Sequence, residues 1–218
     1  MTETWINKDN ALFYEKNTPI LQQWAEAGGL TTWPDLKAIE SYITNASNIL
    51  EIGSGYGRAI SYLLKHHSDK QITALERSSQ LINVLNLQFE KKIAVVHADI
   101  NEYKTTKPFS LILWLWSGFT DFSKAEQPTI LQHVQSLLAS KGALIIETFP
   151  HDITPANGST TASQYYCLSA NQYSLNGFIP TPDEMHDYAE NAGLMLKELI
   201  EYTTTSGRTR KLYCLTKN

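Results

Sequence analysis

Short apolar runs alternate with amphipathic segments through the middle of the chain. Five of these runs have the length and composition of strands: Asn48–Ile52, Gln71–Glu76, Ile93–Ala98, Phe109–Trp114 and Ala143–Thr148. Nearly all of their positions are apolar, which is typical of strands buried on both faces of a sheet. Because helical segments separate the runs, the pattern predicts βαβ units, and hence an α/β fold with a doubly wound, mostly parallel sheet and helices on both faces.

Apolar positions at helical spacing identify three helices between these runs. The first covers Ala59–His66, and the second is expected to have Ser78 or Ser79 as its N-cap. The third is expected to end at Lys141-Gly142, where the glycine would serve as the C-terminal stop. The apolar faces of the second and third helices consist of Leu81, Ile82, Leu85 and Phe89, and of Ile130, Val134, Leu137 and Leu138.

Before the first strand, the pattern is helical over residues 1–45. Thr18-Pro19 has the composition of a helix start, and Gly28-Gly29 marks the corresponding stop. The apolar residues Ile20, Leu21 and Trp24 would share one face of this helix. A second helix is predicted from Asp35 to Ile43.

After the fifth strand, residues Pro150–Thr181 show no clear period. A segment of this length is either a functional lid or an insertion with strands of its own. Thr181-Pro182-Asp183-Glu184 then starts a helix that stops near Gly193. Two last strands form a hairpin around a Ser206-Gly207 turn, over Leu196–Thr203 and Arg210–Thr216.

Composition and charge narrow the function classes. The chain has 218 residues, and its 18 Lys and Arg against 22 Asp and Glu give a net charge of −4, which disfavours a nucleic-acid-binding protein. The two cysteines, Cys167 and Cys214, have no metal-like spacing, so we assign no metal site and no disulfide framework. The most apolar run, Leu111–Trp116, is six residues long, whereas a membrane span needs about 20, and the chain's start lacks a signal peptide's apolar core. We therefore expect a cytoplasmic protein without a membrane partner.

A glycine-rich loop joins the first predicted strand to the first helix: Gly53, Ser54, Gly55, Tyr56 and Gly57. Glycines let a backbone turn sharply and approach a ligand closely, although such turns also occur for packing reasons alone. The dinucleotide fingerprint would need a sixth-position glycine, where this chain has Arg58. Glu51, two residues before the first glycine, would repel a pyrophosphate but suits a cationic amine or sulfonium.

Two further acids end the second and third strands. A carboxylate at Glu76 can accept the hydroxyls of a ribose, a role that NAD sites share. Asp99 can accept the exocyclic amine of an adenine, or it is only a helix cap. Because the carboxyl ends of parallel strands meet at one edge of the sheet, these acids and the glycine loop are expected to surround one ligand.

Together these stretches resemble the ordered motifs of the class I S-adenosylmethionine-dependent methyltransferases. NILEIGSGYG, ITALERS and VVHADI are similar to the first three motifs, FSLILWLWSGF to the fourth and LLASKGALIIETF to the fifth. The resemblance implies a Rossmann-like methyltransferase fold of seven strands, with the C-terminal hairpin as its last two. It also implies a single domain over 1–218: a helical cap over 1–45, a cofactor-binding core over 46–149, an insertion or lid over 150–181, and the last helix and hairpin over 182–218.

The resemblance also implies S-adenosylmethionine as cofactor. Glu51 and Gly53 to Gly57 would surround its methionine part, Glu76 would hold the ribose and Asp99 the adenine amine. Arg77, Ile100 and Trp114 complete the expected cofactor residues. Leu115–Phe119 does not match the Asn/Asp-Pro-Pro-aromatic loop of enzymes that methylate nucleic-acid bases or glutamine, so we expect a small-molecule acceptor.

Candidates for acceptor chemistry are fewer. Glu147 and His151 could orient or deprotonate an acceptor, or they are structural. Tyr14 is added to these catalytic candidates as a lid residue, because the resemblance implies that the N-terminal helices cover the cofactor. The expected substrate residues are aromatic, although they could equally fill the core or anchor the segment after the fifth strand: Trp116, Phe119, Tyr165 and Tyr166. The basic cluster Arg208, Arg210 and Lys211 is interpreted as a solvated hairpin.

The predicted function is methyl transfer from S-adenosylmethionine to a small molecule. Two alternatives stay open: an NAD-dependent oxidoreductase, and a non-catalytic protein of the same fold that binds the adenosyl cofactor. The atom that is methylated and the oligomeric state do not follow from the sequence.

Overall fold

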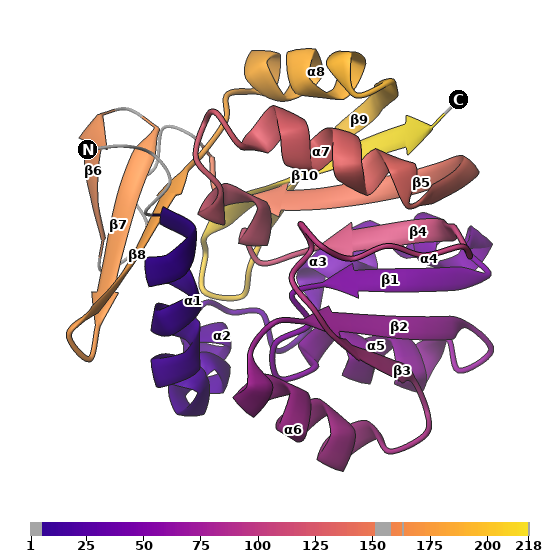
Figure 1. Ribbon diagram of the computed structural model, residues 1–218, viewed down its shortest axis with the longest axis horizontal. Coiled ribbons are helices and arrows are strands. Elements are labelled where there is room, and N and C mark those ends of the chain that lie inside the picture. The colour runs from indigo at the N-terminus through magenta and orange to yellow at the C-terminus, as the bar shows by residue number, and fades with distance from the viewer. Residues whose placement is uncertain (1–5, 151–157, 163, 218) are drawn as a thin grey trace.

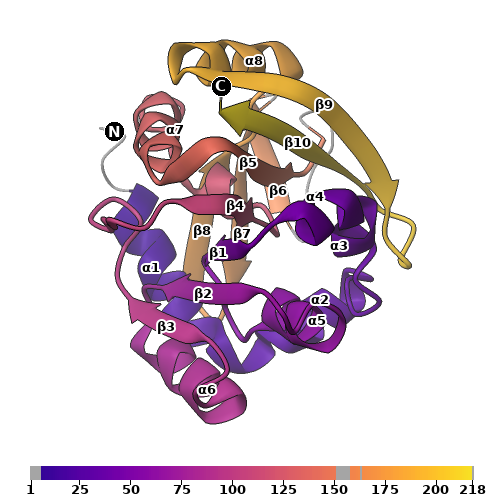
Figure 2. The same ribbon diagram turned by 90° about the vertical axis from the view of Figure 1, so that its right-hand side faces the viewer.

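A seven-stranded sheet forms the centre of the molecule (Figures 1 and 2). The computed structural model describes residues 6–150, 158–162 and 164–217. The strand order is β3-β2-β1-β4-β5-β10-β9. The strands are β1 Asn48–Ile52, β2 Gln71–Glu76, β3 Ala94–His97, β4 Phe109–Trp114, β5 Leu138–Thr148, β9 Leu194–Thr203 and β10 Thr209–Lys217. The first five run parallel, and β10 is antiparallel to both β5 and β9, so the predicted fold class and C-terminal hairpin are confirmed.

Helices cover both faces of this sheet because neighbouring strand residues point to opposite sides. Ile49 packs with one helical layer and Leu50 with the other, and both are fully buried. The first layer is formed by α3 Pro34–Ala38, α4 Glu40–Asn45, α5 Arg58–His66 and α6 Ser79–Phe89. The opposite layer is formed by the 3-10 helix η3 Gly118–Asp121, α7 Gln127–Ser136 and α8 Pro182–Asn191.

Helix caps follow the sequence signals closely in two places. The Ser78 hydroxyl accepts a hydrogen bond from the Leu81 backbone N–H at the start of α6. At the start of α8, Thr181 and Glu184 form a reciprocal capping box, with Pro182 in the first turn. Both predicted starts are therefore confirmed.

Two predicted helices have different bounds. α7 ends at Ser136, and the chain enters β5 at Leu138, so the predicted stop at Gly142 is wrong. Leu138 pairs with Phe109 at the start of the β4–β5 ladder, which accounts for its apolar character. Gly142 is needed for space instead, because a Cβ there would lie 2.9 Å from the carbonyl oxygens of Ala139 and Phe109.

The N-terminal helices are also more divided than the pattern predicts. α1 spans Ile6–Asn17, η2 spans Thr18–Ile20 and α2 spans Leu21–Ala27. The Thr18 hydroxyl donates back to the Tyr14 carbonyl oxygen, so it extends α1 and does not cap α2. The predicted helix from Asp35 to Ile43 is broken at Ile39 into α3 and α4.

The segment after β5 has strands of its own. β6 Gly158–Ala162, β7 Tyr165–Ala170 and β8 Tyr173–Phe178 form a separate antiparallel sheet. Figure 1 shows this sheet beside α1, at the end of the main sheet where the parallel strands terminate. The inserted sheet and the N-terminal helices therefore lie over the edge at which ligands of such folds bind.

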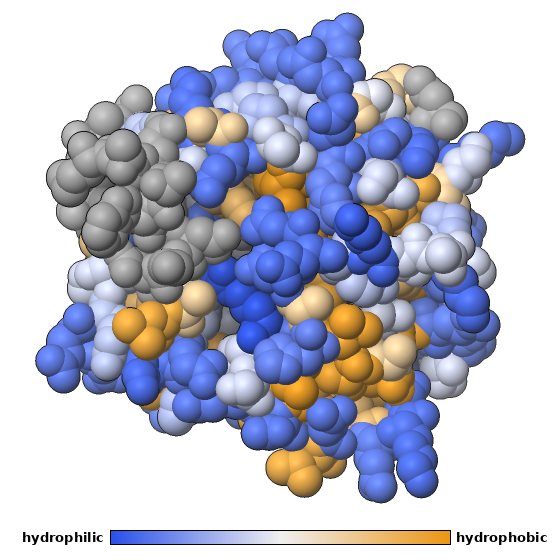
Figure 3. All heavy atoms as spheres, in the orientation of Figure 1, coloured by the Kyte–Doolittle hydropathy of each residue, from blue (hydrophilic) through white to orange (hydrophobic). Residues whose placement is uncertain are grey.

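The surface in this orientation is mostly polar, with apolar side chains gathered over α6 and β3 (Figure 3). None of the helices in the described part of the chain is long and apolar enough to span a membrane.

Candidate active site

A cavity of about 550 Å³ lies at the carboxyl ends of the parallel strands. One half is lined by the glycine loop and the ends of β2, β3 and β4, with Gly53, Gly55, Glu76, Asp99 and Trp114 among its residues. The other half is lined by α1, α2, η3, β7 and the β9–β10 turn. The fold thus brings Gly53, Gly55 and the strand-end acids Glu76 and Asp99 to one cavity, which the two segments that flank the core also line.

The three glycines of the loop have left-handed backbone angles but different surroundings. Gly53, Gly55 and Gly57 have φ of 68°, 57° and 84°. A Cβ on Gly53 would meet nothing within 4 Å, and one on Gly55 only the Gly53 carbonyl oxygen at 3.9 Å. A Cβ on Gly57 would lie 2.2 Å from Cε2 of Phe89. The first two glycines therefore border open space in the cavity, and the third allows α6 to pack.

Glu76 connects the glycine loop to the end of β2. Its carboxylate accepts hydrogen bonds from the backbone N–H groups of Gly55 (2.9 Å), Arg77 (2.8 Å) and Ser78 (2.9 Å). Burial raises the pKa of this carboxyl, and the three N–H donors oppose that shift. The side chain is thus fixed where its oxygens line the cavity and can accept hydroxyl groups.

Glu51 lies behind the loop and does not line the cavity. Its side chain is buried, and burial raises the pKa of the carboxyl to about 8. Among the described residues no hydrogen-bond partner reaches its Oε2. The Ser54 hydroxyl donates to the Glu51 carbonyl oxygen (3.1 Å). Ser54, Tyr56 and Gly57 were also expected to surround the cofactor, but they do not line the cavity. The hydrogen bond between Ser54 and Glu51 therefore stabilises the loop outside the cavity wall.

The far end of this half is formed by residues after β2 and β3. Asp99 accepts from the backbone and side-chain N–H groups of Asn101 at 2.9 and 2.8 Å, and its second oxygen lies 3.5 Å from Arg77. Arg77, Asp99 and Ile100 all line the cavity. The Trp114 ring, held edge-on by Phe119 and Phe122, lines it as well.

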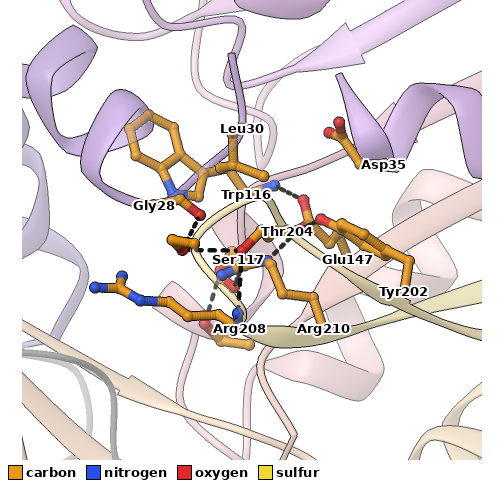
Figure 4. A network of polar contacts seen from close by, with 12 residues as sticks. Gly28, Leu30, Asp35, Trp116, Ser117, Glu147, Tyr202, Thr204, Arg208 and Arg210 are labelled. Atoms are coloured by element: carbon orange, nitrogen blue, oxygen red, sulfur yellow. Dashed lines mark hydrogen bonds and ion pairs between the residues drawn. The ribbon is translucent and has the colours of Figure 1, made fainter. Parts of the chain in front are cut away.

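Glu147 occupies a buried polar network rather than an open position (Figure 4). Its carboxylate is fully buried and forms an ion pair with Arg210. It also accepts from the Tyr202 hydroxyl and from the Trp116 backbone N–H, both at 2.5 Å. With these donors in place, the carboxylate fixes the turn after β4, where Trp116 and Ser117 have φ of 52° and 64°.

The same network overturns the interpretation of the basic cluster as a solvated hairpin. Arg210 is 3% exposed, donates to the Ser117 hydroxyl (2.7 Å) and stacks 4.1 Å over the Phe149 ring. Arg210 is buried because its strand, β10, lies inside the sheet and is paired with β5 on one side and β9 on the other. Arg208, in contrast, is exposed and borders the cavity, and Figure 4 shows it extending away from Glu147.

Tyr14 and Tyr166, separated widely in sequence, meet in the second half of the cavity. The Tyr166 hydroxyl lies 2.7 Å from the Thr120 hydroxyl and 3.5 Å from Oδ1 of Asp121. Both tyrosine hydroxyls interact with Asp121, and burial raises the pKa of this carboxyl to about 7. Asp121 was not predicted from the sequence as a site residue. Its only signal there is its position, as an acid shortly after the fourth strand.

Two other predicted residues, Phe119 and Tyr165, fall outside the cavity. Phe119 is fully buried in the core against Trp114, so its placement as a substrate residue is corrected to core packing. Tyr165 packs on Phe178 with ring centroids 4.9 Å apart and does not line the cavity. His151 lies outside the described residues. Trp116 does line the cavity, as do Phe13, Trp24 and Phe149, which sequence reasoning did not identify.

A protein-family model for a methyltransferase domain matches residues 49–142. A comparison with curated protein sequences finds no match. Within the described residues, no group of three His, Cys, Asp or Glu side chains is placed to hold a metal ion.

Solved structures of methyltransferases share the fold of the whole chain. The 1,6-didemethyltoxoflavin-N1-methyltransferase of Burkholderia thailandensis, with 1,6-didemethyltoxoflavin and S-adenosylhomocysteine bound, has a TM-score of 0.77 at 15% identity, over 100% of this chain and 91% of that one. An amino pentose methyltransferase from Micromonospora echinaspora, bound to S-adenosylmethionine, has a TM-score of 0.64 at 14% identity, over 91% of this chain and 97% of the other. At such identities the likeness shows a common fold.

Proposed function

We propose that this chain, which carries a class I methyltransferase domain, transfers a methyl group from S-adenosylmethionine to a small-molecule acceptor. The observation that supports this most directly is the space over Gly53 and Gly55, beside the fixed carboxylate of Glu76. A ligand with a ribose fits there, because its hydroxyls can reach Glu76 while its chain lies along the glycine backbone. Asp99, Arg77 and Ile100 would surround the adenine, and Trp114 the ring or sulfonium.

The buried Glu51 also fits a cationic cofactor. Its Oε2 has no hydrogen-bond partner within the described part of the chain, and it lies two residues before the glycine loop. A positively charged ligand held by that loop would favour the ionised carboxyl. The NAD-dependent alternative loses support, because the two neighbours described above are methyltransferases and Arg58 forms a buried ion pair with Asp35.

When bound, S-adenosylmethionine supplies a methyl group already activated by a positive sulfur. The chain's residues then act mainly by holding the acceptor in line with that methyl, an effect worth about 7–11 kcal/mol at best. Glu147 contributes as a positioning residue, since it fixes the Trp116–Ser117 turn that borders the cavity. The inserted sheet and the N-terminal helices act as a cap that excludes water.

Small-molecule specificity is supported by the elements that line the cavity and by the neighbours. Residues of helices α1 and α2 and of strand β7 line its second half. One neighbour acts on 1,6-didemethyltoxoflavin and another on an amino pentose. A cytoplasmic location stays a prediction from the sequence.

Calorimetric titration with S-adenosylmethionine, S-adenosylhomocysteine and NAD tests the cofactor. We expect micromolar binding of both adenosyl compounds and none of NAD. Gly55→Leu should abolish this binding by filling the cavity, whereas Gly207→Leu is a matched control, since Gly207 also has a left-handed φ (79°) and open space but does not line the cavity. Equal binding by the Gly55 variant and the wild type would contradict the site, and binding of NAD alone would contradict the function.

A further inference from the structure

Asp121 is the one carboxylate among the described residues that lines the second half of the cavity. The other two lining carboxylates, Glu76 and Asp99, belong to the half assigned to the cofactor. Asp121 ends η3, directly after the turn that Glu147 fixes. An acceptor that enters between the N-terminal helices and the inserted sheet would therefore meet this carboxylate.

The position of Asp121 is held from three sides. Asn10 of α1 donates to the Asp121 carbonyl oxygen (3.0 Å) and to that of Asn176 in β8 (2.7 Å), and its own side-chain oxygen accepts from the Asn176 N–H (2.8 Å). Gly177 of β8 lies so close to η3 that a Cβ there would be 2.4 Å from the Thr120 carbonyl oxygen. The helix, the insertion and η3 thus form one rigid support, as a positioned reactive group requires.

Aromatic rings form the walls around this carboxylate. Phe13 and Trp24 stack with ring centroids 5.6 Å apart and an interplanar angle of 27°. Phe149 and Tyr166 meet edge to face, and Trp116 completes the lining. Flat rings on several sides favour a flat acceptor.

Three arginines border the same cavity: Arg77, Arg208 and Arg210. Arg210 is balanced by its ion pair with Glu147, and Arg77 lies 3.5 Å from Asp99, whereas Arg208 is exposed at the rim. A neutral ring that loses a proton to Asp121 becomes an anion, and the positive charge of Arg208 favours that anion over a cation.

We infer that the acceptor is a planar heteroaromatic ring with a ring N–H, and that Asp121 is the base that accepts its proton. This inference rests on the proposed function. The ring nitrogen gives its proton to the Asp121 carboxylate and forms a bond to the methyl carbon of S-adenosylmethionine. The carbon–sulfur bond breaks with its electron pair on sulfur, so the products are the N-methyl ring, S-adenosylhomocysteine and a proton that leaves Asp121 to solvent.

The surroundings of Asp121 suit a base that works near neutral pH. Burial raises the pKa of its carboxyl to about 7, and the groups that face it are Tyr14 from α1, Tyr166 from β7 and Arg77 from the loop after β2. The tyrosines stay protonated, because burial and Asp121 raise the pKa of both phenols. The carboxyl is therefore the group in this cluster that gains and loses a proton near pH 7.

Lumazine, a flat ring system with acidic N–H groups, and tyramine, an aromatic cation, are the two probes. With S-adenosylmethionine present, we expect wild-type protein to release S-adenosylhomocysteine with lumazine and not with tyramine, at a rate that rises with pH through about 7. Asp121→Asn should lower kcat/KM for lumazine by about 10²–10⁴-fold and abolish that rise. It should also weaken lumazine binding to the S-adenosylhomocysteine-loaded protein in calorimetry, while Asp187→Asn, at an exposed acid of α8, behaves as wild type.

Turnover of tyramine in preference to lumazine, or of neither probe, overturns the acceptor class. An Asp121→Asn protein that keeps kcat/KM within threefold overturns the role of the carboxylate. If wild-type protein binds S-adenosylhomocysteine in these experiments, either failure concerns the acceptor alone. Absence of that binding would instead contradict the proposed function itself.

Discussion

The guanidinium of Arg210 forms an ion pair with the carboxylate of Glu147, and their side chains are 4% and 0% exposed. The two residues are 63 positions apart and meet because β5 and β10 are antiparallel neighbours. Since the carboxylate also accepts from the Trp116 backbone N–H, one buried pair connects the interior of the sheet to the wall of the cavity. The pair therefore links the stability of the fold to the shape of the cavity wall at Trp116.

Glu147→Gln should destabilise the protein strongly. The amide leaves the Arg210 charge buried without its counterion, a change that costs about 3–5 kcal/mol. For a chain of this length, that corresponds to a fall in Tm of roughly 6–20 °C. Thermal and urea unfolding measure it. Glu201→Gln is the matched control, because Glu201 is 59% exposed and its 3.4 Å ion pair with Lys211 is worth at most about 1 kcal/mol. Equal melting of the two variants would show that the buried pair is dispensable.

The glycine loop offers a second comparison, between Gly57 and Gly53. Alanine at either position adopts a left-handed φ, at a cost of about 1–2 kcal/mol. Only at Gly57 would the new Cβ also collide with the buried ring of Phe89, which adds about 1–3 kcal/mol. We therefore expect urea unfolding to rank Gly57→Ala as the less stable variant, and calorimetry to rank Gly53→Ala as the weaker binder of S-adenosylhomocysteine. The reverse order in either measurement would contradict the division of the loop into packing and binding positions.

The sequence predicts that Gly53, Gly55, Glu76 and Asp99 lie at one edge of the sheet, because its signals for them are local. Glycines, a strand-end carboxylate such as Glu76 and a cap such as Ser78 each depend on a few neighbouring residues, and parallel strands bring their carboxyl ends together. The prediction that the helix reaches Gly142 is wrong for a local reason too. Leu137 caps α7 and Leu138 begins β5, and both are buried, so a short apolar run does not distinguish a strand start from a helix face.

The places of Arg210 and Asp121 in the second half of the cavity could not be predicted, because their contacts are long-range. The burial of Arg210 depends on which strand lies beside β10, and its position in a hairpin next to Arg208 suggests exposure. Asp121 gains its place only when Asn10 and the inserted sheet dock on η3. The direction of a side chain in a turn cannot be predicted from the sequence either. Trp116 lines the cavity, whereas Phe119, three residues later, is buried in the core.

Trp116 and Phe119 should therefore respond differently to truncation. Phe119→Ala removes a fully buried ring from the core beneath Trp114 and should cost about 3–5 kcal/mol of unfolding free energy. Trp116→Ala removes a partly exposed ring from the cavity wall, so its stability should change less while the KM for the acceptor rises. Urea unfolding and initial rates with the acceptor distinguish them. A large loss of stability at Trp116, with none at Phe119, would exchange the two assignments.

Stability should depend on pH through Glu51. Burial raises the pKa of its carboxyl to about 8, from about 4.5 in the unfolded chain. Below the unfolded value, both states hold the proton and the folded state carries no penalty. Between the two values only the folded state holds it, so the free energy of unfolding falls as pH rises, by up to about 1.4 kcal/mol per pH unit. Above about pH 8 both states are ionised and the loss is complete.

Glu51→Gln removes this titration and should flatten that part of the pH dependence. Between about pH 4.5 and 8, we expect the free energy of unfolding of the variant to rise steadily relative to that of the wild type, because its amide needs no proton to remain buried. Urea unfolding at several pH values measures the difference between the two curves, in which the contributions of other titrating groups cancel. Glu102→Gln, at an exposed position, should instead run parallel to the wild type. A constant difference between Glu51→Gln and wild type across this range would show that Glu51 is already ionised in the folded protein.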